Sequence, residues 1–175
     1  MTVLFLVGEP GCGKTTLAKR LIEPDSYLIP SPKWTVGMKV CAAGHYSGST
    51  FDGADTVPYN GVDAALTLWE ADLRALPLTI FDGDRFSNAG VVERLRASGA
   101  QQGLSIRCIH LHVPENIAAS RRAQRGSNQN PSWLKGRKTK AARFAAMPLF
   151  DGSLDLSSEM GPAKLEALTR AFLDQ

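Results

Sequence analysis

The chain alternates between short continuous apolar runs and segments whose apolar residues recur at helical spacing. The run 2–7 (TVLFLV) is rich in β-branched and large side chains, which predicts a fully buried strand. Residues 15–22 predict a helix directly after it, and residues 27–29 predict a short strand. The stretch 30–60 is rich in Gly, Ser, Thr and Pro and lacks helical periodicity, so we expect a long working loop there.

Helical spacing returns over residues 62–76, where Leu66, Trp69 and Leu73 share one side. The remaining predicted elements are a strand at 78–81, a helix at 89–98, a strand at 105–113, a basic helix from 114 to about 126, a second basic segment at 133–146, a strand at 154–156 and a last helix from 161. Strands that alternate with helices predict an α/β three-layer sandwich, here with a five-stranded parallel sheet.

Composition fits one such domain over all 175 residues, because 43% are hydrophobic and 21% are charged. The three cysteines form no C-x-x-C pair, so reduced thiols in a cytoplasm are expected. The apolar N-terminus is short and Glu9 interrupts it, which predicts neither a signal peptide nor a membrane span. No obligate protein partner is evident.

The segment Gly8-Glu9-Pro10-Gly11-Cys12-Gly13-Lys14-Thr15 fits the phosphate-binding pattern G-x-x-x-x-G-K-[ST], between a predicted strand and a predicted helix. Its glycines let the backbone curl so that successive N–H groups point at phosphate oxygens. Lys14 is expected to reach the β- and γ-phosphates of ATP, and the Thr15 hydroxyl to bind Mg²⁺. The expected nucleotide-binding residues are Gly8, Gly11, Cys12, Gly13, Lys14, Thr15 and Thr16.

A second polar cluster follows the predicted strand 78–81. Asp82 comes directly after the apolar run and is the expected support for Mg²⁺. Asp84 and Arg85 lie further out, where Arg85 is expected to clamp the acceptor or the transferring phosphoryl group. The alternative is a solvated turn that holds an Asp84–Arg85 surface pair. Asn88 is expected to cap the next helix.

The segment 33–63 is acidic and aromatic, and from 40 to 63 it contains no Lys or Arg. A carboxylate that accepts the proton of an acceptor hydroxyl is expected here, and Asp55 is slightly preferred over Asp52. His45 is expected either to bind the acceptor or to stabilise the loop. Aromatic side chains that could stack on a base are Trp34, Tyr46, Phe51 and Tyr59. The alternative is an ordered loop in which the Asp residues form Asx-turns.

Positive charge gathers between residues 115 and 143, where eight Lys or Arg stand against one acid, Glu115. We expect this segment to be a basic lid in which Arg121 and Arg125, four residues apart, share a helical face and stabilise the transferring phosphoryl. Four further cations at 135–140 exceed what one triphosphate needs, which favours a polyanionic acceptor such as DNA. A generic solvated basic face is the alternative.

Three motifs together resemble the small P-loop nucleoside and nucleotide kinases. They are GEPGCGKT, the strand end FDGDRFS and the arginine-rich SRRAQRG. The segment GHYSGSTFDGADTVPYNG further resembles bacteriophage P-loop kinases that phosphorylate 5-hydroxymethyluracil in DNA, an early step of thymidine hypermodification. This resemblance implies a hydroxymethyl acceptor on a DNA base and a host-cell cytoplasmic location.

Two rival functions stay open at this point. One is a kinase for a free nucleoside, nucleotide or other small molecule, although residues 40–63 offer no arginine for an acceptor phosphate. The other is a nucleotide-dependent switch or ATPase that has no acceptor. For a kinase, the residues expected to bind the acceptor are His45, Tyr46, Phe51, Asp84 and Arg85.

Overall fold

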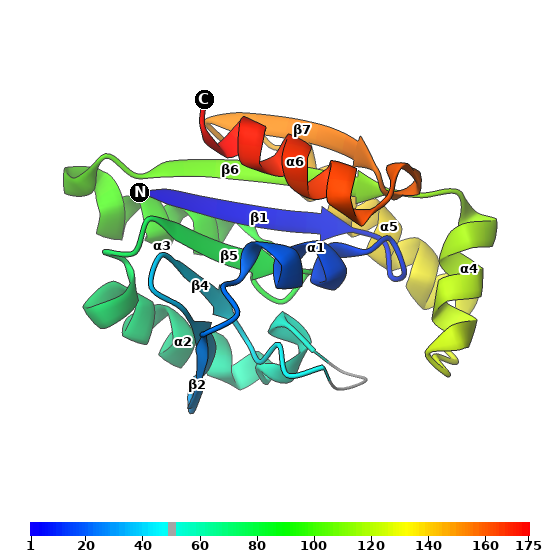
Figure 1. The fold of residues 1–175 in the computed structure, drawn as a ribbon, viewed down its shortest axis with the longest axis horizontal. Coiled ribbons are helices and arrows are strands. Elements are labelled where there is room, and N and C mark those ends of the chain that lie inside the picture. Colours follow the sequence, from blue (N-terminus) through cyan, green and yellow to red (C-terminus); the bar gives the residue numbers. More distant parts are fainter. Residues whose placement is uncertain (49–51) are drawn as a thin grey trace.

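A seven-stranded sheet in the order β2-β3-β4-β5-β1-β6-β7 organises the chain in the computed structural model, which describes residues 1–48 and 52–175 (Figure 1). The parallel strands are β4 (Val40–Ala43), β5 (Leu78–Asp82), β1 (Thr2–Gly8), β6 (Ser105–His112) and β7 (Gly152–Ser157). An antiparallel hairpin, β2 (Tyr27–Pro30) and β3 (Lys33–Val36), extends the β4 edge. The expected three-layer α/β fold is confirmed.

The sheet has seven strands rather than the expected five, and the difference lies within residues 30–60. Both β3 and β4 are four residues long, and a turn that includes Gly37 separates them. Strands this short give too few positions for a periodicity signal, and the surrounding Gly, Ser and Pro conceal them. The predicted strand at 27–29 exists, but it pairs in the antiparallel hairpin rather than in the parallel set.

Helices cover both faces of the sheet (Figure 1). Buried side chains of α1 (Lys14–Leu21), α4 (Glu115–Gln124) and α6 (Pro162–Leu173) pack on one face. The other face is covered by α2 (Val62–Leu68) with its π-helical extension (Trp69–Leu73), α3 (Ala89–Gly99) and α5 (Pro131–Ala145). All predicted helices are present, and Asn88 caps α3 as expected, with its side chain accepting from Val91 N. Among the described residues no helix is long and apolar enough to cross a bilayer.

An aromatic cluster fills the core beneath α5. The ring of Phe5 on β1 stacks on Phe81 with centroids 5.4 Å apart, and it meets Phe144 of α5 edge-on at 5.4 Å. Trp34 meets Phe81 from β3 at 5.8 Å. These rings fix β1 and β5 relative to each other, and these are the two strands that carry the phosphate loop and Asp82.

Replacing Phe5 by alanine tests how much this cluster contributes to the stability of the fold. Phe5 is 0% exposed, so the substitution should lower the free energy of unfolding by about 3–5 kcal/mol, through lost burial and a residual cavity. Leu28→Ala on β2 is the control: Leu28 is 44% exposed, and its change should stay within about 0.5 kcal/mol. Urea unfolding of the two variants measures both values, and equal destabilisation would contradict the assignment of the core.

The parallel register brings the carboxyl ends of β1 and β5 together. Leu6 of β1 lies opposite Asp82 of β5, and Gly83 N donates to Leu6 O at 2.9 Å. The loop from Gly8 to Gly13 leaves β1 at this same edge and enters α1. In open parallel sheets this edge is where ligands bind.

Candidate active site

The backbone of the phosphate loop curls in a way that depends on its glycines. Gly8, Gly11 and Gly13 have φ values of 148°, 91° and 99°, which side chains of L-residues rarely allow. A Cβ at Gly8 would lie 2.1 Å from Leu111 O, and one at Gly11 would lie 2.7 Å from Ala118 O. Any side chain at these two positions would therefore push the loop off β6 and α4 and open the cradle.

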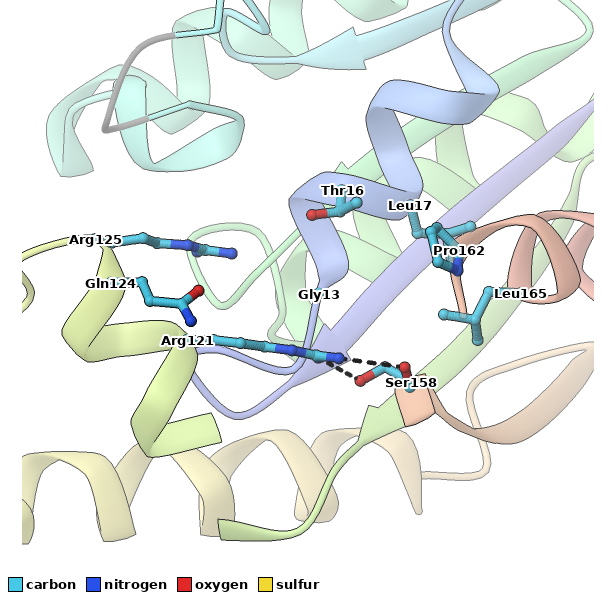
Figure 2. A pocket seen from close by; sticks show the side chains of 9 residues that line it. All are labelled: Gly13, Thr16, Leu17, Arg121, Gln124, Arg125, Ser158, Pro162 and Leu165. Carbon is cyan, nitrogen blue, oxygen red and sulfur yellow. Dashed lines mark hydrogen bonds between the residues drawn. The ribbon is translucent and has the colours of Figure 1, made fainter. Parts of the chain in front are cut away.

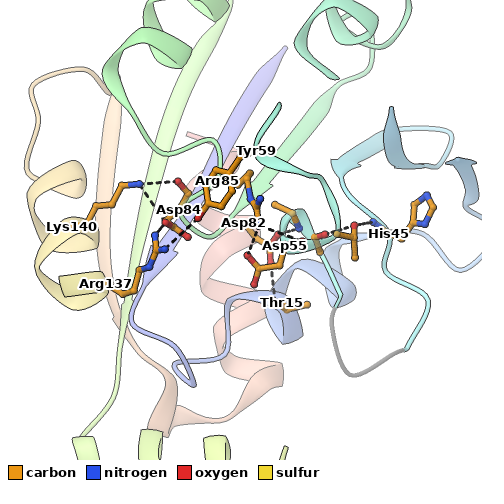
Figure 3. A network of polar contacts seen from close by, with 12 residues as sticks. Thr15, His45, Asp55, Tyr59, Asp82, Asp84, Arg85, Arg137 and Lys140 are labelled. Atoms are coloured by element: carbon orange, nitrogen blue, oxygen red, sulfur yellow. Dashed lines mark hydrogen bonds and ion pairs between the residues drawn. The ribbon is translucent and has the colours of Figure 1, made fainter. Parts of the chain in front are cut away.

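Lys14 and Thr15 occupy the first turn of α1, directly beside the loop. Lys14 Nζ donates to Gly8 O at 2.9 Å and to Glu9 O at 3.0 Å, so the ammonium lies across the mouth of the curl. Thr15 Oγ1 donates to Asp82 Oδ2 at 2.8 Å, which joins the loop to the end of β5 (Figure 3). Cys12 is fully buried in the core on the α1 side, so its place in the motif is structural.

The two predicted metal ligands are thus brought together from positions 67 residues apart in the chain. A threonine hydroxyl and a carboxylate are hard oxygen donors, which suit Mg²⁺. Mg²⁺ keeps several waters and takes further ligands from substrate phosphates, so two protein side chains are enough to place it. The residues present fit a magnesium site next to the phosphate cradle.

Asp82 is held in place by the segment predicted to bind the acceptor. Tyr46 OH donates to Asp82 Oδ1 at 2.7 Å, and Ala54 N donates to the same oxygen at 2.8 Å. Burial, and then the charge of Asp82, raise the pKa of Tyr46 well above its ordinary value, so the phenol stays a donor. Tyr46 therefore orients the carboxylate instead of stacking on a base as the sequence predicted.

Tyr46→Phe removes this donor and keeps the ring. We expect Asp82 to lose its fixed orientation, so that the Mg²⁺ concentration for half-maximal turnover rises about 10-fold or more, in line with other outer-shell partners of metal ligands. Tyr27→Phe is the matched control, since Tyr27 is 59% exposed on β2. A Mg²⁺ titration unchanged by Tyr46→Phe would contradict the positioning role.

A cleft of about 700 Å³ opens beside the cradle, and it is lined by residues of the loop, the segment 52–59, the β5 end and the basic helices. The Arg85 guanidinium lies 3.8 Å from the centre of the Tyr59 ring, and its Nη2 lies 3.9 Å from Asp55 Oδ1 (Figure 3). Tyr59 is 65% exposed and presents an aromatic face at the rim. The cleft thus joins a phosphate site, a carboxylate, a cation and an aromatic ring.

The two candidate bases differ in their surroundings. Asp52 is buried, pairs with Lys19 of α1 and accepts from Gly48 N at 2.9 Å, so it ties the loop to α1. Asp55 lines the cleft, and 66% of its side-chain surface is exposed to solvent. The walls of the cleft and the charge of Asp82 raise the pKa of Asp55, while Lys14 and Arg85 oppose that rise. A carboxylate with a raised pKa that faces a cavity suits a general base.

Asp84 does not form the surface pair with Arg85 that was the alternative interpretation of this turn. Instead its carboxylate pairs with Arg137 and, at 3.3 Å, with Lys140 Nζ, both on α5 (Figure 3). Arg85 turns toward Asp55 and Tyr59. The adjacent Asp84 and Arg85 in the sequence could not show these pairings, because the partners of Asp84 lie more than 50 residues away in the chain.

The structure places the remaining acceptor candidates outside the cleft or beyond the described residues. Trp34 is fully buried beneath the sheet, so its predicted stacking role is wrong. His45 Nε2 lies 2.8 Å from Ile29 O, which assigns the ring to holding the loop against β2. Phe51 lies outside the described residues.

A smaller cavity of about 280 Å³ adjoins the other side of α1 (Figure 2). The apolar part of its wall is formed by Leu17, Pro162 and Leu165, and Arg121 and Arg125 border it from α4. Arg121 Nη1 donates to Ser158 Oγ at 2.7 Å and to Gly11 O at 3.3 Å, which fixes the guanidinium against the loop. Thr16 and Arg125 line both cavities, so the two are neighbours across the start of α1.

Sequence reasoning missed two residues that shape the site. Arg122 is buried, pairs with Glu115 and donates to Pro10 O at 2.9 Å, so it ties α4 to the phosphate loop. Glu9, also buried, lies 3.4 Å from Lys138 Nζ of α5. The sequence held one signal for the second contact. A carboxylate at Glu9, inside the phosphate loop, needs a cationic partner if it becomes buried.

Three comparisons relate the chain to known proteins. The AAA domain family (AAA_33) matches residues 3–148. Two solved structures are similar over nearly the whole chain at 17% identity and a TM-score of 0.53: a sugar kinase from Janibacter sp. HTCC2649, covering 99% of this chain and 94% of its own, and the tunicamycin resistance protein of Deinococcus radiodurans, covering 98% and 95%. A search of curated proteins gave no significant match.

Proposed function

The chain belongs to the AAA domain family (AAA_33), and from this membership and its site we propose that it is an ATP-dependent kinase acting on the hydroxymethyl group of 5-hydroxymethyluracil in DNA. One observation carries the catalytic part of the proposal. The phosphate cradle, the Thr15–Asp82 pair and the open carboxylate of Asp55 line a single cleft. A nucleotide-binding module without an acceptor has no use for a carboxylate and an arginine aimed into that space.

The two cavities suit the two ends of ATP. The smaller one has apolar walls and the Arg121 guanidinium, which suit a purine base and its ribose. The larger one contains Gly8, Lys14 and Thr15 and receives the triphosphate. Bound Mg²⁺ would be held by Thr15 and Asp82 and would neutralise charge on the phosphates. Arg125, which lines both cavities, can follow the triphosphate from one to the other.

The transfer step uses the wall opposite the cradle. Asp55 accepts the proton of the acceptor hydroxyl as its oxygen forms a bond to the γ-phosphorus. The bond from that phosphorus to the β,γ-bridging oxygen breaks, and its electron pair leaves with ADP. Lys14 and Arg85 place positive charge around the transferring group, which stabilises the charge it carries in the transition state.

Two features support a base within DNA as the acceptor. Tyr59 offers an exposed ring under the Arg85 guanidinium at the rim of the cleft, which is suited to stacking on a base turned out of a strand. The helix α5 carries five Lys or Arg, at positions 135, 137, 138, 140 and 143, beside the same rim. The resemblance of the segment 44–61 to kinases of 5-hydroxymethyluracil in DNA points the same way.

A labelled-phosphate assay tests the proposal. The protein is incubated with [γ-³²P]ATP, Mg²⁺ and one of three acceptors: an oligonucleotide with 5-hydroxymethyluracil, the free nucleoside, or its monophosphate. We expect label in the oligonucleotide and none in an oligonucleotide with thymine. Label in the nucleoside alone would replace the DNA acceptor with a small molecule, an alternative that the similarity to the sugar kinase from Janibacter sp. HTCC2649 also favours. Hydrolysis of ATP without labelled acceptor would contradict kinase function.

A further inference from the structure

A second groove, of about 610 Å³, runs along α5 on the side away from the phosphate cradle. It lies between α5 and the start of α3, and Ser87 and Lys140 line both this groove and the proposed catalytic cleft. A ligand that extends out of the cleft past Lys140 therefore enters the groove without leaving the protein surface. The proposed transfer reaction makes no use of this space.

The groove has a strongly cationic wall. Lys135, Thr139 and Arg143 are spaced four residues apart, so they form one stripe along the exposed face of α5, with Lys140 beside it. Among the described residues no Asp or Glu lines the groove, and neither Lys135 nor Arg143 forms an ion pair. The N-terminus of α3, at Asn88 and Ala89, adds partial positive charge to the opposite wall.

The shape of the groove suits a chain rather than a compact ion. From Lys135 to Arg143 the helix rises about 12 Å, whereas one strand of B-DNA carries a phosphate about every 3.4 Å along its axis. Gly136, next to Lys135, leaves open space beside that end of the wall, because a Cβ there would meet nothing within 4 Å. Met147, which is partly exposed, supplies apolar surface at one end of the groove, against which a sugar or base can pack.

We propose that this groove binds the phosphodiester backbone of the DNA strand next to the nucleotide that enters the cleft. The proposal rests on the proposed function, and it names the surface by which a polymeric acceptor is distinguished from a free nucleoside. Lys135 and Arg143 contact phosphates and position the strand without reading its sequence. Lys140 marks the point where the strand turns from the groove into the cleft.

The test combines binding and kinetics on the full-length protein. The variant is Lys135→Ala/Arg143→Ala, and the control is Lys39→Ala/Lys164→Ala, which removes two exposed cations outside the groove. Binding of a fluorescein-labelled oligonucleotide is followed by anisotropy at several salt concentrations. Two lost phosphate contacts should reduce the slope of log K against log [salt] by about 1.4–1.8 and weaken binding roughly 10-fold or more. The KM for the free nucleoside should not change.

A second variant tests the open shape of the groove independently of its charge. Gly136→Leu keeps every cation but places a side chain in the open space, and it should also weaken oligonucleotide binding, whereas Gly136→Ala should not. A salt slope equal to that of the wild type in Lys135→Ala/Arg143→Ala would overturn the proposal. The proposal would also be overturned if Lys135→Ala/Arg143→Ala raised the KM for the monophosphate as much as the KM for the oligonucleotide. That result would assign the groove to the acceptor's own phosphate. If the groove variants weaken DNA binding but the wild-type protein transfers no phosphate, the groove is still a DNA-binding site and the proposed function is refuted.

Discussion

Lys14→Ala should reduce turnover by about 10²–10³-fold, the loss typical of removing one preorganised charge-stabilising group. The Lys14 ammonium lies across the mouth of the curled loop, 2.9 Å from Gly8 O, where the outer phosphates of ATP would enter. Once this charge is gone, the β- and γ-phosphates lose their nearest fixed cation on the protein. Steady-state transfer of labelled phosphate to the preferred acceptor measures the loss.

Two controls make the Lys14 result specific. Lys39→Ala removes an exposed cation far from the loop in sequence and should leave turnover unchanged. Lys14→Arg keeps the charge but replaces a compact ammonium with a planar fork, so we expect it to recover only part of the activity. Full activity in Lys14→Ala would show that the loop does not hold the reacting phosphates.

Asp55→Asn should lower kcat by about 10²–10⁴-fold, because the acceptor hydroxyl loses the group that takes its proton. Asp52→Asn is the matched control within the same loop. It breaks the ion pair with Lys19 and should lower the melting temperature, while kcat falls by less than about tenfold. The opposite order of the two effects on kcat would assign the base to Asp52.

The pH profile gives an independent measure of the same assignment. A base must be deprotonated to act, so activity falls as the pH drops through the pKa of Asp55, which burial in the cleft and the charge of Asp82 raise above its ordinary value. Arg85 is among the charges that oppose this rise. Arg85→Ala should therefore raise the pKa further and move the acid limb of kcat/KM to higher pH. An acid limb that keeps its position in Arg85→Ala, or that persists in Asp55→Asn, would contradict the role of Asp55.

The phosphate loop could be predicted from the sequence because its requirements are local. Two glycines, Lys14 and Thr15 stand at fixed spacings between an apolar run and a helix, and the structure shows why the first glycine is needed: a side chain at Gly8 would collide with β6. Asp82 could also be predicted, since it directly follows a continuous apolar strand. The parallel register then brings it beside the loop without further information.

The acceptor side could not be predicted to the same depth, because its contacts join distant parts of the chain. The sequence pattern around an aromatic residue in a Gly-rich segment does not show whether its side chain is buried, as Trp34 is, or exposed, as Tyr59 is. Tyr46 donates to Asp82, and Asp84 pairs with α5; both contacts depend on which strands and helices become neighbours. Short strands such as β4 carry too little periodicity to fix that arrangement in advance.

Calorimetric titration of the wild-type protein with ATP, ADP and AMP, each with and without Mg²⁺, tests the central claim most directly. If Gly8, Lys14 and Thr15 grip the outer phosphates beside Asp82, ATP and ADP should bind at least tenfold more tightly than AMP, and Mg²⁺ should strengthen ATP binding. Equal affinity for AMP and ATP, indifferent to Mg²⁺, would contradict the account.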